Sequence, residues 1–148
     1  MTAEELLERY AAGERDFSGV NLEGVNLSGT ELRGIILRGA NLRQANLRDS
    51  DLSGYWEKPN PMVLTDLREA NCCEVDFSGT TLEVVDFSNA ILTGANFNSA
   101  VLDRVWFIDA NLEDVNWSEC RVWRFSVEGA RLGTGLEDII RTDWRKRC

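Results

Sequence analysis

The sequence contains no histidine among its 148 residues. This absence excludes catalytic arrangements that need a Ser-His or Cys-His pair, and it excludes histidine as a metal ligand. No apolar run approaches the roughly 18 residues that a membrane-spanning helix needs. The first residues are acidic rather than apolar, which is not typical of a signal peptide. We therefore expect a cytoplasmic protein that does not enter a membrane.

Basic residues are in the minority, with 16 lysines and arginines against 25 acids and a net charge of −9. A negative chain disfavours direct binding to nucleic acid or anionic lipid. The four cysteines, Cys72, Cys73, Cys120 and Cys148, show no CxxC spacing. We expect free thiols in a reducing compartment and no bound metal.

Apolar residues recur at every fifth position. The series begins at Phe17, pauses after Leu52, resumes in phase at Leu67 and ends at Leu132, which makes 22 units. Of these 22 central residues, 18 are Leu or Phe, and the residue before the centre is Asp or Asn in 13 units. Small or apolar residues such as Ala40 stand two positions before the centres, and mostly polar residues or glycine follow them.

A period of five fits neither an α-helix nor a continuous strand. Two buried positions that lie two residues apart suit a short strand, and the remaining residues suit a corner that turns the chain. Repeated corners of one hand build a solenoid whose coils pair through main-chain hydrogen bonds. The pattern therefore predicts an all-β solenoid with its apolar centres inside.

The units resemble those of the pentapeptide-repeat family, whose consensus is Ala, then Asp or Asn, then Leu and two further residues. Segments 40–44, 45–49 and 110–114 match this consensus directly, and residues 4–17 are similar to the start of short cyanobacterial members. The resemblance implies a right-handed, four-sided β-helix of about 5.5 to 6 coils. With four sides, the alternating aromatic and Leu centres from Phe77 to Trp117 predict two aromatic ladders on opposite sides of the interior.

Both ends of the chain predict a helix, which gives three segments: a capping helix over 1–15, the β-helix over 16–132, and a C-terminal helix over 133–148. At the start, Thr2 and Glu5 form a capping box before the apolar residues Leu6 and Tyr10. The C-terminal helix either covers the open end of the solenoid or forms a dimer contact.

The repeat is interrupted at residues 55–64, where both prolines lie. This segment is either an extruded loop or two distorted sides of a coil. Loops carry function more often than their scaffold does, and Tyr55, Trp56 and Met62 are suited to contact a partner. Packing of the same residues back onto the coil is the alternative.

A second group of candidate contact residues lies at outward positions of the repeat. Val84, Val101 and Trp123 are expected on one side in successive coils, and Trp106 and Ile108 on the adjoining side. A contiguous apolar patch would indicate a protein interface. Coverage by the C-terminal segment is the competing explanation.

The function that we expect is a rigid scaffold that binds a protein partner or a second copy. We expect no enzyme and no cofactor, because a coil filled by Leu and Phe leaves no pocket and its carboxylates, serines and thiols form no paired set. The alternative function is an inhibitor or protector of DNA gyrase, since some family members imitate DNA. Residues 64–119 hold 11 acids against two arginines, a DNA-like charge density, although some of these acids are expected to bond turns.

Overall fold

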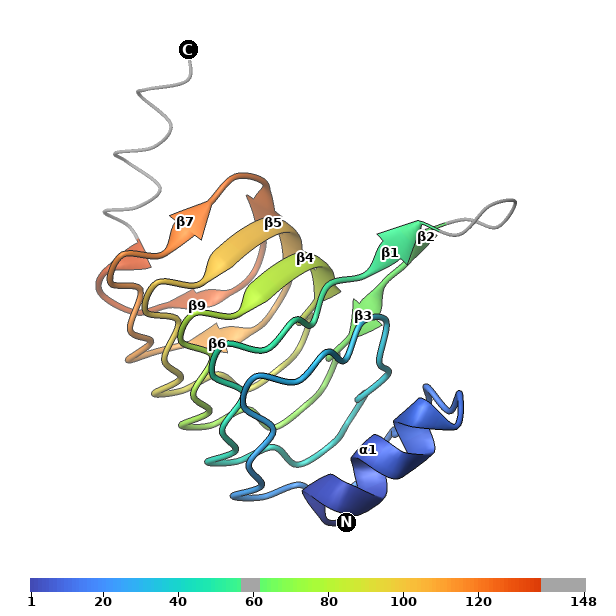
Figure 1. Ribbon diagram of the computed structural model, residues 1–148. Coiled ribbons are helices and arrows are strands. Elements are labelled where there is room, and N and C mark those ends of the chain that lie inside the picture. The colour runs from blue at the N-terminus through green and yellow to red at the C-terminus, as the bar shows by residue number, and fades with distance from the viewer. Residues whose placement is uncertain (57–61, 137–148) are drawn as a thin grey trace.

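The computed structural model describes residues 1–56 and 62–136, which form a β-solenoid preceded by one helix (Figure 1). Its elements are α1 (Ala3–Ala11), β1 (Tyr55–Trp56), β2 (Met62–Val63), β3 (Thr65–Asp66), β4 (Thr81–Asp86), β5 (Val101–Trp106), β6 (Asn111–Leu112), β7 (Arg121–Val122), β8 (Phe125–Ser126) and β9 (Arg131–Leu132). Strands β3, β4, β5 and β7 follow one another in a parallel sheet in which β8 also pairs with β5, and β6 pairs with β9. Paired residues such as Asn21 and Asn41 are twenty positions apart, so each turn holds four five-residue units.

The consensus unit is explained by hydrogen bonds at each corner. In the unit centred on Leu42, the Asn41 side-chain oxygen accepts the Arg43 N–H (3.2 Å), and the Leu42 carbonyl accepts the Ala45 N–H (2.8 Å). Gln44 between them has a φ of 57°, the left-handed region that favours glycine. The corner therefore favours Asp or Asn before the centre and Gly or a polar residue two positions after it.

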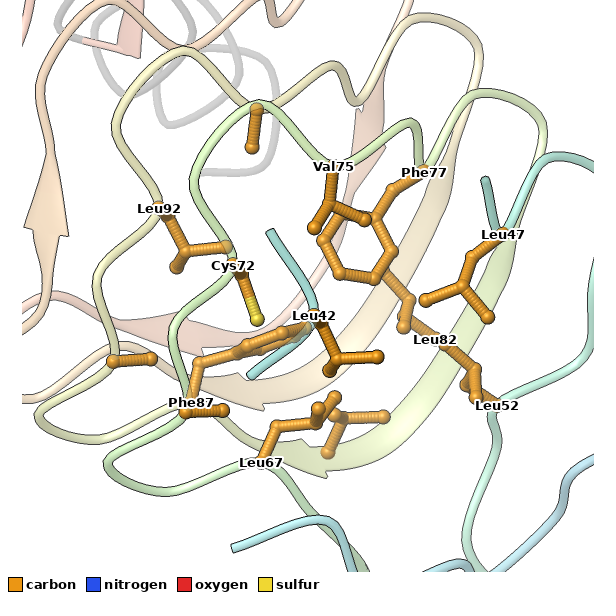
Figure 2. Close-up of a cluster of buried hydrophobic side chains, with 14 of the residues drawn as sticks. Leu42, Leu47, Leu52, Leu67, Cys72, Val75, Phe77, Leu82, Phe87 and Leu92 are labelled. Atoms are coloured by element: carbon orange, nitrogen blue, oxygen red, sulfur yellow. The ribbon is translucent and has the colours of Figure 1, made fainter. Parts of the chain in front are cut away.

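The centres of the units fill the interior (Figure 2). Phe97 stacks on Phe77 and on Trp117, with ring centroids 4.8 and 4.9 Å away. Phe87 stacks on Phe107 at 5.3 Å, and rings of the two stacks meet edge to face. Stacked and edge-to-face geometries are the ones that aromatic pairs prefer. The prediction of two inner aromatic ladders is confirmed.

Helix α1 lies at the N-terminal end of the solenoid (Figure 1). The predicted capping box is present in part, because the Thr2 hydroxyl accepts the Glu5 N–H at 3.1 Å. Leu6 is fully buried in the core, and the ammonium of Met1 donates to the Asn21 carbonyl (3.1 Å). The predicted C-terminal helix falls almost wholly outside the described residues. The right-handed sense and the coil count stay predictions.

The interruption of the repeat is an extruded hairpin. Strands β1 and β2 pair antiparallel, with Tyr55 opposite Val63 and Trp56 opposite Met62, and they project from the solenoid (Figure 1). The coil passes beneath them without the ten extra residues, because Asp51 pairs with Thr81, thirty positions later instead of twenty. Of the two arrangements expected for residues 55–64, the pairing of Tyr55–Trp56 with Met62–Val63 agrees with the extruded loop. We call β1 and β2 the hairpin.

Gly54 at the base of the hairpin gives a testable prediction about this exit from the coil. A Cβ atom on Gly54 would lie against the carbonyl oxygen of Val63 and 2.9 Å from that of Val84, and both obstacles are backbone. We expect Gly54→Asn to lower the free energy of unfolding by about 1–3 kcal/mol, the usual cost of overpacking. Urea denaturation measures this change.

The matched control is the same substitution at Gly39. That glycine has a φ of 65° and open space where its Cβ would be. Asn tolerates the left-handed region, so we expect Gly39→Asn to change the stability by less than about 0.5 kcal/mol. Equal costs at the two positions would show that the close approach at Gly54 does not constrain the hairpin.

Candidate partner-binding surface

The exposed aromatic residues lie on the hairpin and on the side of the coil beside it. Trp56 is 67% exposed on β1, and Trp123 is 45% exposed next to β7. Trp123 and Val101 line an open groove of about 510 Å³. Its full lining is Thr81, Leu82, Glu83, Val101, Asp103, Trp123 and Arg124, which we call the groove. The structure thus brings together two of the three residues predicted for this side.

The third of these residues, Val84, is not part of an exposed patch. Its side chain is only 1% exposed, although it lies outside the main core cluster. The base of the hairpin approaches it, because the Val84 carbonyl oxygen lies next to Gly54. Val84 also has a φ of 61°, which marks a corner of the chain. The sequence pattern placed Val84 in its coil but gave no sign that the hairpin would approach it.

The remaining candidates are half-buried rather than freely exposed. Tyr55 packs back onto the coil, since its ring occupies the space beside Gly34. Met62 pairs with Trp56 in the hairpin. Trp106 ends β5 and pairs with Asp86 on the adjoining side, where Ile108 follows it. Trp56 and Trp123 are therefore the candidates that offer the most surface to a partner.

Charged residues outside the predicted contact set border the groove. The Arg124 guanidinium makes two hydrogen bonds to the Asp103 carboxylate, at 2.8 and 2.7 Å, and Arg104 pairs with Glu83. Each pair joins residues 21 positions apart, one coil plus one residue, so the repeat register could have indicated them. Because the charges cancel locally, the groove is suited to an uncharged occupant.

The acidic stretch of residues 64–119 is also offset by arginines from other coils. Glu69 pairs with Arg38 at 2.6 Å, and Glu113 pairs with Arg131 at 3.2 Å. Burial opposes ionisation of Asp66, but hydrogen bonds from the Arg68 side chain and backbone outweigh it and hold the pKa of this carboxyl below its ordinary value. The stretch therefore presents less free negative charge than its sequence implies.

The thiols show no sign of a reactive or metal-binding site in the part of the chain that the structure describes. Cys72, Cys73 and Cys120 are free, and burial raises the pKa of the Cys120 thiol to about 12 and that of Cys72 still further. No group of three potential metal ligands occurs among residues 1–56 and 62–136. Within the same residues, none of the helices has the length and apolar character to span a bilayer.

Comparison with known families agrees with this geometry. The family model for pentapeptide repeats matches residues 16–54, 65–104 and 85–116, with eight copies. These ranges cover more than half of the chain and leave out the hairpin. No curated protein sequence matches the chain.

Solved structures with the same fold include two pentapeptide-repeat proteins from cyanobacteria. Rfr23 from Cyanothece 51142 is 27% identical with a TM-score of 0.68, over 89% of this chain and 95% of its own. The protein alr5209 from Nostoc Pcc 7120 is 21% identical with a TM-score of 0.56, over 90% of this chain and 87% of its own. Trypsin-treated QnrB1, a plasmid-mediated fluoroquinolone resistance protein, is 16% identical with a TM-score of 0.48, over 88% of this chain and 64% of its own.

Proposed function

Because the chain belongs to the pentapeptide-repeat family, we propose that it is a non-enzymatic scaffold whose groove and hairpin bind a protein. One observation carries the proposal. The unit centres from Phe17 to Val122 are buried, yet Trp56 on the hairpin and Trp123 at the groove remain 67% and 45% exposed. Large aromatic residues on a surface are the residues that most often dominate a protein interface.

The position of the hairpin supports a single binding surface. The Gly54 N–H at the base of the hairpin donates to the carbonyl oxygen of Glu83, a groove residue, at 2.6 Å. Trp123 lies two coils further along the same side, about 10 Å away at the usual spacing of paired strands. The hairpin and the groove can therefore contact the same partner from two directions. A right-handed coil of about 5.5 to 6 turns, as proposed from the repeat, would hold both rigidly.

The gyrase-directed alternative draws less support from the charges. Imitation of DNA requires a run of free negative charge along the axis. Here Glu69 and Glu113 are paired with arginines from outside residues 64–119, and Glu83 is paired with Arg104 inside them. A scaffold that recognises its partner through aromatic side chains agrees better with this surface.

Affinity capture from a cell extract tests the proposal. The tagged protein is compared with the double variant Trp56→Ala/Trp123→Ala and with the control Ile91→Ala. Ile91 is also 45% exposed, but it lies ten residues before Val101 and therefore on the opposite side of the coil. We expect the double variant to lose the captured partner by at least about tenfold, because aromatic hot spots each contribute about 2 kcal/mol or more. We expect Ile91→Ala to retain it. Equal capture by all three proteins would refute the proposed surface.

A further inference from the structure

We propose that the groove accepts the hairpin of a second copy of this chain, so that two copies exchange hairpins around a twofold axis. The proposal rests on the proposed function, since it names the partner of the same surface. It joins two observations from residues 1–56 and 62–136, the part of the chain that the structure describes. These are the exposed side chain of Trp56 on the hairpin and the open groove that contains Trp123 on the coil beside it.

The hairpin of one copy does not fill the groove of that copy. Trp56 is the most exposed large apolar residue among those that the structure describes. Its neighbour across the hairpin is Met62, and its own groove still has about 510 Å³ of open space. The ring of Tyr55 packs toward Gly34, which directs the two side chains of β1 to different surroundings. An indole that leaves its own coil in this way is available to another molecule.

The chemistry of the groove matches an indole. Val101 and Trp123 offer apolar and aromatic surface, on which a second indole can stack. The carboxylates of Glu83 and Asp103 lie at the same groove and are hydrogen-bond acceptors, and the indole N–H is a donor only. Because both carboxylates already pair with arginines, the occupant needs no charge of its own.

The placement of the two features favours a closed dimer over an open chain. The hairpin leaves the coil next to Glu83, so that donor and acceptor surfaces share one side of the molecule. A surface that contains both halves of a contact is self-complementary, and a twofold axis then satisfies both contacts at once. If the halves lay on opposite sides, repeated association would produce filaments instead.

The area available predicts a weak dimer. A buried tryptophan side chain loses about 150–250 Å² of accessible surface, and the groove that receives it loses a similar area. Two reciprocal contacts therefore bury about 600–1,000 Å², below the 1,200–2,000 Å² of a standard stable interface. We expect a dimer that dissociates in the micromolar to millimolar range, and an experiment at low concentration would miss it.

Sedimentation velocity of the purified protein over about 10 µM to 1 mM, the range that this area suggests, tests the proposal. We expect monomer and dimer in concentration-dependent exchange, with no larger species. Because each substitution removes both reciprocal contacts, Trp56→Ala and Trp123→Ala should each raise the dissociation constant by about a hundredfold, about tenfold per contact. Ile91→Ala, on the opposite side, should leave the constant unchanged. Circular dichroism verifies that the variants stay folded.

A mixture of the two tryptophan variants provides a second, independent test. The Trp123→Ala copy keeps an intact hairpin and the Trp56→Ala copy keeps an intact groove. Their heterodimer therefore regains one contact, and its dissociation constant should fall about midway, on a logarithmic scale, between those of the wild-type protein and the single variants. Failure of the mixture to associate more strongly than either variant alone would overturn the exchange of hairpins.

The outcomes separate this inference from the proposed function. A wild-type protein that stays monomeric at 1 mM, or a dimer that both tryptophan variants leave intact, would overturn the inference. If the tryptophan-dependent capture from extract persisted in that case, the scaffold function would stand with a different protein as the partner. Wild-type species larger than a dimer would overturn the twofold arrangement.

Discussion

Replacing Phe97 by alanine should lower the free energy of unfolding by about 3–5 kcal/mol, the usual cost of truncating a buried phenylalanine. Phe97 is fully buried and forms the middle of one aromatic ladder, with stacked neighbours on both sides at 4.8 and 4.9 Å. It also meets Phe87 and Phe107 of the other ladder edge to face. The loss is large because the cavity would open between coils that cannot move together without breaking their main-chain pairing.

The position of Phe97 also predicts how the variant unfolds. In a solenoid each coil contacts only its neighbours, so a weakened coil in the middle separates the stack into two parts. We expect a broader unfolding transition in guanidinium chloride, with a lower m-value than that of the wild-type protein. The transitions followed by fluorescence and by circular dichroism should no longer coincide. A sharp transition that both probes report at the same denaturant concentration would contradict this local effect.

The control for this prediction is Phe97→Leu. The same column of the interior holds leucine in earlier coils, at Leu27 and Leu47, as the pairing of residues 26, 46, 76 and 96 shows. Leucine therefore suits the backbone at this position, and the substitution should cost less than about 1.5 kcal/mol. A loss as large as that of Phe97→Ala would indicate that the aromatic stacking itself, rather than the filling of volume, holds the coils.

The interior of this protein could be predicted because each coil repeats the same local rule. The residue before each centre, the centre itself and the left-handed residue after it are all fixed by one corner, as the hydrogen bonds around Asn41 and Leu42 illustrate. The order of Phe77, Phe97 and Trp117 along one side follows from the number of units in a turn. No contact distant in sequence had to be known beyond the twenty-residue register.

The surface could be predicted only in part, because it depends on the interruption. Adding twenty residues correctly brings Val101 and Trp123 to one side, but across the hairpin the register is thirty. For this reason the pairing of Glu69 with Arg38, 31 positions apart, was not evident from the sequence. Val84 is buried, and its carbonyl oxygen closely approaches Gly54 at the base of the hairpin, which no repeat rule contains.

The arginines beside the acidic stretch bear on which partners the surface suits. Considered as a sequence, residues 64–119 have a net charge of −9 and suggest an electrostatic imitation of DNA. In the fold, arginines from earlier and later coils lie beside these acids, as Arg38 and Arg131 do. Exposed ion pairs contribute little to stability, but they weaken the negative field that such imitation needs. Under the proposed function, aromatic contacts would then supply most of the affinity.

Replacing Leu6 by alanine tests whether α1 protects the end of the solenoid. Leu6 is fully buried in the core, and Tyr10 of the same helix donates from its hydroxyl to the Arg33 carbonyl at 2.8 Å. We expect Leu6→Ala to lower the free energy of unfolding by about 2–5 kcal/mol, because it removes a core side chain and loosens the helix. Leu7→Ala is the matched control, and it should cost less because Leu7 is only half-buried.

The same variant should also change how the protein associates. A strand edge that is no longer covered pairs readily with another chain, so a loosened α1 exposes the first coil to uncontrolled association. We expect the Leu6→Ala protein to form large aggregates below its unfolding temperature, detectable by light scattering. Adding Trp56→Ala should not suppress them, since the exposed edge lies at the end of the coil and not at the groove. Aggregation that this second substitution abolished would assign the association to the hairpin, and α1 would then contribute stability without protecting an edge.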